Sequence, residues 1–188
     1  MKRIDVSFSL KTEAVLRKMI GKEFQCYKCD PYERSSAAYG IIGIKIGNVG
    51  YEFSNYVEAA DYFGKLEDVA TFRLQQSAYD AIQSPYQESN MIETKVGKIL
   101  SEIAVVNEKQ SLLKGNVKIY EVNVTRGVIF KFRDGSEFSL EKDIWFSEDI
   151  IFRQGRNLIY KFEPVEKFYD SWSAPYRGEC IRNMVIIK

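Results

Sequence analysis

The sequence contains no histidine, and this absence removes several kinds of chemistry at once. Imidazole is the usual base of nucleophilic triads, the commonest acid–base group near neutral pH and a frequent metal ligand. Enzymes that rely on carboxylates, lysine, tyrosine or thiolate do exist. The absence nevertheless favours a protein that binds over one that catalyses, and no cofactor is expected.

Cysteine and long apolar runs are also scarce. Three cysteines are an odd number, which is typical of a protein in the reducing cytoplasm rather than of a secreted disulfide scaffold. No run of about 18 apolar residues occurs, so no membrane-spanning helix and no membrane partner are expected. Asp5, Lys11 and Glu13 interrupt the N-terminal segment, which therefore lacks the apolar core of a signal peptide.

The chain has no large excess of either charge: 27 basic residues face 26 acidic ones. Proteins that bind nucleic acid usually carry a basic excess, because their cations displace counterions from the phosphates. Nucleic-acid binding would therefore depend on a local patch, and basic residues do recur on the strands predicted in the second half: Lys118, Arg126, Lys131, Arg133 and Arg153. It is kept as a further alternative that is not favoured.

What is present is an ordinary globular composition, with 45% apolar and 28% charged residues, and an imperfect internal repeat. The stretch KIGNVGYEFSN at 45–55 resembles KFRDGSEFSL at 131–140, and LEDVATFR at 66–73 resembles SEDIIFR at 147–153. The order is the same in both halves and the spacing is about 85 residues. This pattern predicts two related units, 1–85 and 86–188, with chance similarity between amphipathic hairpins as the alternative.

Each unit is expected to begin with a helix. Apolar residues at helical spacing predict one over 12–21 and another over 91–103, where Asn90 and Glu93 have the spacing of a capping box. A short helix is also expected within 55–65, and 141–146 is expected to be irregular. The fold class predicted is α+β, in which antiparallel strands follow each helix and the two units pack tightly together.

Alternating or β-branched segments predict the strands. They span 22–29, 39–47, 116–124, 127–132, 136–140, 149–154 and 157–162, and RNMVIIK at 182–188 is expected to be a buried closing strand. Asp134-Gly135 is typical of a two-residue hairpin turn. The polar stretch 74–90, with Pro85, is the expected linker between the units.

The cysteine motif Cys26-Tyr27-Lys28-Cys29 could in principle hold a metal or exchange disulfides. Only Asp30 or Cys180 offers further ligands, and the motif ends a strand instead of opening a helix. A structural role is therefore the preferred interpretation.

Two carboxylate pairs, Glu67-Asp68 and Glu148-Asp149, occupy matching places in the two units. Together they could bind a divalent cation and support a carboxylate-dependent hydrolase or nuclease. Neighbouring residues on a strand point to opposite faces, so either pair alone converges poorly on one ion. Surface charge is the preferred interpretation of these four residues.

Aromatic residues gather in the C-terminal arm EKFYDSWSAPYRGEC at 166–180. Trp172, Tyr176 and Arg177 are of the types that dominate binding hot spots, and Trp145 invites the same interpretation. The alternative is that these side chains complete the core. The function predicted is non-enzymatic binding of a macromolecular partner, most simply another protein; the hydrolase or nuclease is the alternative.

Overall fold

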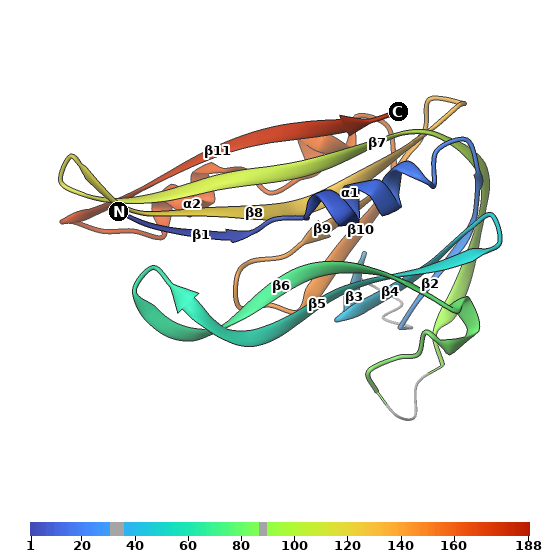
Figure 1. The fold of residues 1–188 in the computed structure, drawn as a ribbon, viewed down its shortest axis with the longest axis horizontal. Helices are drawn as coiled ribbons and strands as arrows, with labels where there is room; N and C mark the ends of the chain where they lie inside the picture. The colour runs from blue at the N-terminus through green and yellow to red at the C-terminus, as the bar shows by residue number, and fades with distance from the viewer. Residues whose placement is uncertain (31–35, 87–89) are drawn as a thin grey trace.

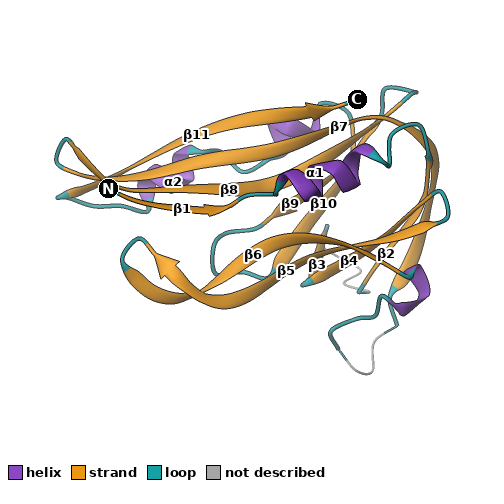
Figure 2. Cartoon of the chain, viewed as in Figure 1, coloured by secondary structure: helices purple, strands orange, loops and turns teal. Residues whose placement is uncertain are grey.

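The computed structural model describes residues 1–30, 36–86 and 90–188, and within them the chain forms one sheet with a few short helices (Figure 2). The strands are β1 (Lys2–Val6), β2 (Glu23–Cys29), β3 (Ala37–Tyr39), β4 (Ile41–Ile46), β5 (Val49–Tyr62), β6 (Lys65–Ser77), β7 (Ile92–Lys114), β8 (Val117–Phe132), β9 (Glu137–Lys142), β10 (Asp149–Gly155) and β11 (Tyr176–Ile187). The helices are α1 (Leu10–Arg17), α2 (Glu166–Asp170) and the 3₁₀ turns η1 (Tyr79–Ala81) and η2 (Leu158–Lys161).

The sheet consists mainly of two antiparallel meanders. The first meander is β2-β4-β5-β6 and the second meander is β7-β8-β9-β10, and each strand pairs with the next one named. The initial strands of the two meanders, β2 and β7, pair antiparallel and join them. The second meander is extended by β1, which lies parallel to β8, and by β11, which lies antiparallel to β7.

Strand β7 is long enough to belong to two parts of the molecule. Its first residues pair with β2, while its residues from Ile103 to Lys114 pair with β11. Figure 1 shows β7 running along the layer that contains β1, β8 and β11 and then curving down towards β2. The sheet is therefore folded over, so that β5 and β6 lie opposite that layer (Figure 1).

A second connection between the two layers passes through Gly40. This glycine lies between β3, which pairs with β10, and β4, which belongs to the first meander. Its φ of +68° is favourable only for glycine, and its N–H donates to the carbonyl of Glu148 at 3.1 Å. The backbone N–H of Asn55 on β5 donates to the Gly40 carbonyl at 2.8 Å. The first meander is thus tied to the end of the second.

The main core lies between the layers and is rich in phenylalanine. The ring of Phe24 contacts those of Phe130 and Phe138 edge-on, at 5.4 Å and 5.3 Å between ring centres. Helix α1 covers one side of this core with Leu16, and Met19, just after the helix, belongs to the same apolar cluster. Ser9 caps this helix by accepting a hydrogen bond from the Thr12 N–H. The helix predicted at the start of the chain is present.

The predicted α+β class and the predicted helix over 91–103 are wrong, because the chain is mostly antiparallel sheet and this segment opens β7. Its apolar residues fit a helical period, but Ile92, Val96 and Ile99 are β-branched and favour extended backbone. Pairing with β2 on one side and β8 on the other satisfies the backbone and outweighs the weak helical preference. The units are not each preceded by a helix.

Two further local predictions are wrong, and some others hold only in part. Residues 55–65 form the β5–β6 hairpin instead of a short helix, and 157–162 contains η2 instead of a strand. The remaining predicted strands are present, although 116–132 is one strand. The closing strand is also present, but most of 182–188 is exposed or half-buried instead of buried. The chain does turn at Asp134-Gly135, but the loop has three residues, 133–135, instead of two, because the Phe132 N–H donates to the Ser136 carbonyl and only Gly135 has a positive φ. Residues 87–89 of the predicted linker lie outside the described residues.

The repeated sequence motifs occupy one register in both meanders. Ser54 pairs with Arg73 across β5 and β6, and Ser139 pairs with Arg153 across β9 and β10. The hairpins on the other side differ, because Glu52 pairs with Gly43 whereas Glu137 pairs with Lys131. The common register is what a duplication requires; the duplication itself stays a prediction. None of the helices in the described part of the chain is long and apolar enough to cross a membrane.

Candidate functional site

A pocket of about 230 Å³ lies where the second meander and β11 meet the loop after β9 and the segment around α2. Its polar lining comes from the strands, with Glu108 and Gln110 on β7, Arg126 on β8 and Arg182 on β11. Its apolar lining includes Tyr62, Trp145, Phe146 and Phe168. The pocket therefore combines parts of the chain that are far apart in sequence.

A β-bulge places Arg126 in this pocket. Val106 pairs with Gly127 and the next residue of β7, Asn107, pairs with Thr125, so Arg126 is the extra residue of β8. A bulge of this kind bends the strand and changes the direction of its side chains. Arg126 is 7% exposed, and its partners must come from the surrounding segments.

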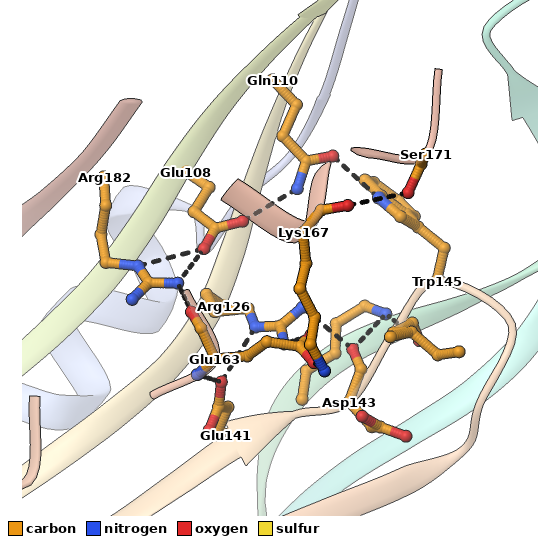
Figure 3. Close-up of polar contacts among 12 residues, drawn as sticks. Glu108, Gln110, Arg126, Glu141, Asp143, Trp145, Glu163, Lys167, Ser171 and Arg182 are labelled. Carbon is orange, nitrogen blue, oxygen red and sulfur yellow. Dashed lines mark hydrogen bonds and ion pairs between the residues drawn. The ribbon is translucent and has the colours of Figure 1, made fainter. Parts of the chain in front are cut away.

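Arg126 lies at the centre of a buried ion-pair network (Figure 3). Its Nε donates to Glu141 at 3.2 Å, its Nη2 donates to Glu163 at 2.9 Å and its Nη1 donates to the Asp143 carbonyl at 3.2 Å. Glu141 is fully buried and also accepts a hydrogen bond from Arg153 at 2.7 Å. The network connects β8, β9 and β10 to the segment that covers them.

A second chain of polar contacts crosses the pocket from β11 to the loop after β9. Arg182 is paired with Glu108 across the two strands and donates to it from Nε at 3.1 Å. Gln110 donates to the same carboxylate at 2.8 Å and accepts a hydrogen bond from the Trp145 indole N–H at 2.8 Å. The indole of Trp145 is thus held in one orientation (Figure 3).

The network keeps its ionised groups charged. Burial disfavours the charged form of Arg126, but attraction by Glu108, Glu141 and Glu163 outweighs burial and raises its pKa. Burial also opposes ionisation of Glu163, but the hydrogen bond from Lys167 and the charge of Arg126 lower its pKa. The pocket therefore contains fixed charges at neutral pH.

Lys142 is the exception among these charged residues, because no carboxylate pairs with it in the described part of the chain. It is 2% exposed; its Nζ donates to the carbonyls of Asp143 and Ile144 and lies 5.1 Å from the centre of the Trp145 ring. Burial, assisted by the positive charge of Arg126, lowers the pKa of Lys142 to about 7. This amine therefore changes its charge near neutral pH.

The tip of the β5–β6 hairpin forms part of the aromatic wall. The ring of Tyr62 lies 5.5 Å from Trp145 and 4.9 Å from Phe146. Phe63, in the turn, has a φ of +50°, which is unfavourable for a bulky residue, and its ring packs against Phe168 and Trp172. The contacts with the second meander offset this local strain.

The four aromatic and basic residues predicted to bind a partner are not gathered in one place. Trp145 lines the pocket, whereas Trp172 packs beside it against Phe63 and Phe168. Tyr176 and Arg177 lie at the start of β11, and Arg177 forms an exposed ion pair with Glu179 at 2.9 Å. Trp145 is therefore the predicted residue that belongs to the pocket lining.

The two carboxylate pairs do not form a metal site. Glu67 and Asp68 are exposed on β6, whereas Glu148 accepts a hydrogen bond from the Val57 N–H at 2.9 Å. Asp149 begins β10. In residues 1–30, 36–86 and 90–188, no three acidic or cysteine side chains are close enough to share a metal ion. The geometry offers no support for the cation-dependent alternative.

The cysteines and the predicted basic strands are also mostly engaged inside the fold. Cys26, Cys29 and Cys180 are buried free thiols, and burial raises the pKa of Cys29 to about 11 and of Cys180 to about 12. Arg153 faces Glu141 and Lys131 pairs with Glu102 at 3.0 Å. These residues therefore support neither redox chemistry nor a free positive surface.

The sequence analysis did not identify Glu108, Gln110, Glu141, Glu163 or Arg182 as site residues. These residues are polar or charged, and four of them lie on strands: Glu108 and Gln110 on β7, Glu141 on β9 and Arg182 on β11. A polar residue in a buried strand is a signal that it has a specific partner. Comparisons with protein-family models, with curated proteins and with solved structures found no match for this chain.

Proposed function

We propose that the protein binds a small organic molecule in the pocket between β7, β8, β11 and the segment 143–172. The observation that carries this proposal is the composition of the pocket: an aromatic wall faces a set of polar groups held in place by their own hydrogen bonds. Ligand sites are typically concave and apolar, with a few fixed polar groups. No catalytic step is proposed.

The size of the pocket limits the ligand. A volume of about 230 Å³ corresponds to about eight water molecules, so a molecule of about ten non-hydrogen atoms would fill it. Ile144 and Phe146, both half exposed, line the pocket and would cover part of such a molecule. Burial of an aromatic or branched body against these side chains would supply the affinity.

The proposal is tested by the indole signals of the two tryptophans. The N–H of Trp145 points to Gln110 at the pocket, so a bound molecule should shift its ¹H–¹⁵N signal. We expect small aromatic compounds of about ten non-hydrogen atoms to produce this shift in a saturable way, with weak affinity of about 0.1–1 mM. Failure of a chemically mixed set of such compounds to shift the signal would contradict the proposal.

A pair of variants makes the test specific. Val165 lines the pocket, and Val165→Trp should fill it and abolish the ligand-induced shift. Tyr160 lies on η2, is 85% exposed and does not line the pocket, so Tyr160→Trp is the matched control and should bind normally. Binding that survives Val165→Trp in a folded protein would place the ligand elsewhere.

A second candidate function, association with another protein, is favoured by the outer edge of β11. This strand pairs with β7 on one side, and none of the described strands pairs with it on the other. Ile181, Met184 and Ile186 are exposed along it. The other long edge strand, β6, is protected by charge, since Glu67, Asp68 and Arg73 are exposed there. Exposed apolar edge strands invite pairing with another strand.

The partner we propose for this edge is the β11 strand of a second copy. In an antiparallel pairing centred on Ile181, this residue meets its own copy and Tyr176 faces Ile186. Arg177 then faces Val185 and Glu179 faces Asn183, so that no like charges meet. A dimer should appear by sedimentation at about 100 μM and dissociate in Ile181→Lys, but not in the β6 control Leu66→Lys. A wild-type monomer at that concentration would contradict it.

A further inference from the structure

Resting on the proposed function, we infer that the ligand of the pocket is a small organic anion, an aromatic or branched carboxylate whose carboxylate group faces the Arg126–Arg182–Lys167 side. The charges that line the pocket are the first argument. Arg126, Lys167 and Arg182 are positive, and Glu108 and Glu163 are negative, so one positive charge is left over. A ligand with a single negative charge would neutralise it.

The hydrogen bonds of the lining give the second argument. Both carboxylate oxygens of Glu108 and of Glu163 already accept hydrogen bonds from described residues, and the side-chain carbonyl of Gln110 accepts one from Trp145. The acceptors of this lining are therefore engaged before any ligand enters. A ligand rich in donors would have to share these acceptors with the residues that already bind them.

The donors, in contrast, retain capacity. A guanidinium has five N–H groups, and Arg126 and Arg182 each make three hydrogen bonds to described groups. The Lys167 ammonium has three N–H groups and donates one to Glu163. The lining therefore has spare donors, which suit a ligand that accepts hydrogen bonds. Charge and hydrogen bonding point to the same chemistry.

An aromatic wall beside carboxylates could instead suggest a cage for an organic cation. Two features oppose this interpretation. Glu108 and Glu163 are each bound by an arginine, and Lys167 adds a further positive charge at Glu163. Lys142 also lies over the Trp145 ring, with its Nζ 5.1 Å from the ring centre, and adds positive charge there when it is protonated. A second cation would meet repulsion in a poorly solvated site.

Three probes of nearly equal size test the inference: phenylacetate, its neutral amide phenylacetamide and the cation 2-phenylethylamine. Charge-assisted hydrogen bonds are about twice as strong as neutral ones, so phenylacetate should bind about tenfold more tightly than the amide, and the amine least. The readout is the titrated shift of the Trp145 indole signal at constant ionic strength. Added salt should weaken phenylacetate binding more than amide binding.

A variant of the charge itself sharpens the test. Lys167 is 68% exposed, so Lys167→Gln should not disturb folding, and it should reduce phenylacetate affinity about fivefold while leaving amide affinity unchanged. Lys161, which is exposed and does not line the pocket, is the matched control as Lys161→Gln. This pair separates a local contact from a general loss of positive charge.

The outcomes distinguish this inference from the proposed function. If the amide or the amine binds as tightly as phenylacetate, or if Lys167→Gln affects all three probes alike, the anion assignment is wrong and the pocket is still a binding site. If none of the three shifts the Trp145 signal at about 10 mM while other small aromatic compounds do, the assignment is also wrong. If no compound of any charge shifts the Trp145 signal, the proposed function is wrong as well.

Discussion

The two meanders share a strand order and a register, yet they use corresponding positions in opposite ways. When Ser54 is aligned with Ser139, Tyr56 corresponds to Glu141 and Val57 to Lys142. Val57 is 40% exposed, whereas Lys142 is 2% exposed. The first meander thus leaves an apolar side chain in water where the second buries an amine.

The same contrast holds for the paired arginines. Arg73 in the first meander binds Glu58 at 2.6 Å with both side chains exposed, whereas Arg153 in the second binds the fully buried Glu141 at 2.7 Å. The two distances are nearly equal, but the surroundings differ, because Glu141 is buried beneath the segment after β10, whose Glu163 N–H donates to it, whereas Glu58 and Arg73 stay exposed. Burial, not geometry, decides how much each ion pair matters for stability.

The largest effect is expected from Glu141→Gln. This change leaves Arg126 buried without its full counter-charge and weakens the contact with Arg153. Removing one partner from a buried ion pair typically costs about 3–5 kcal/mol, so urea unfolding should show a large loss of stability. A loss of less than about 1 kcal/mol would mean that burial does not distinguish the meanders.

Lys142→Met should stabilise the protein, by an amount that depends on pH. Below about pH 7, where the folded and unfolded chains both carry the proton, the buried charge opposes folding fully. Between about pH 7 and the ordinary lysine pKa of 10.5, the unfolded chain holds more protons, so wild-type stability should rise with pH.

The Lys142→Met variant has no amine at this position, so its stability lacks the pH dependence that Lys142 causes. Replacing a buried charge by a hydrophobic side chain is often stabilising by about 1–4 kcal/mol, so Lys142→Met should gain about this much at pH 6 and less at pH 9. Urea unfolding of both proteins at pH 6 and pH 9 measures this gain in stability. The difference between wild type and variant removes the contribution of the buried thiols, which also titrate above neutral pH. An equal gain at both pH values would show that the amine does not titrate in this range.

The contrast between the meanders also shows what the sequence could predict. The place of the hairpin turn at Asp134-Gly135 was predictable because turns favour these residues, but its loop has three residues instead of the predicted two. The opening of β7 was not predictable, because the spacing of its apolar residues also matches a helical period, as that of Ile92, Val96 and Ile99 does. Whether this segment forms a helix or a strand is decided by its pairing with β2 and β8, which depends on distant parts of the sequence.

The candidate site was only partly predictable for the same reason. Trp145 was identified because its residue type is typical of binding sites. Arg126 was noted only as a basic strand residue, since a bulge that depends on the register of two strands brings it to Glu141 and Glu163. Glu108 and Arg182 are 74 residues apart and meet only because β11 pairs with β7.

Asn55→Leu replaces a residue of the first meander by its counterpart in the second, Leu140. Asn55 is fully buried, and its Nδ2 donates to the carbonyls of Ser147 and Asp149 at 3.0 and 3.2 Å. The Ser147 carbonyl would lose this donor and the Asp149 carbonyl would keep the Asp143 N–H, at a cost of about 1–3 kcal/mol in unfolding experiments. Asn183→Leu, at an exposed position on β11, should change stability little. Equal effects would show that Asn55 does not tie the meanders together.

The smallest effect is expected at the exposed pair of the first meander. A double-mutant cycle with Glu58→Gln and Arg73→Gln should give a coupling of about 0.2–1 kcal/mol that falls as salt is added, because solvent and ions screen both charges. The same cycle with Glu141→Gln and Arg153→Gln should give a larger coupling that salt changes little, since Glu141 is fully buried. The two cycles compare pairs of similar distance whose arginines occupy corresponding positions, so a coupling of equal size and equal salt dependence would show that burial does not set the strength of the pair.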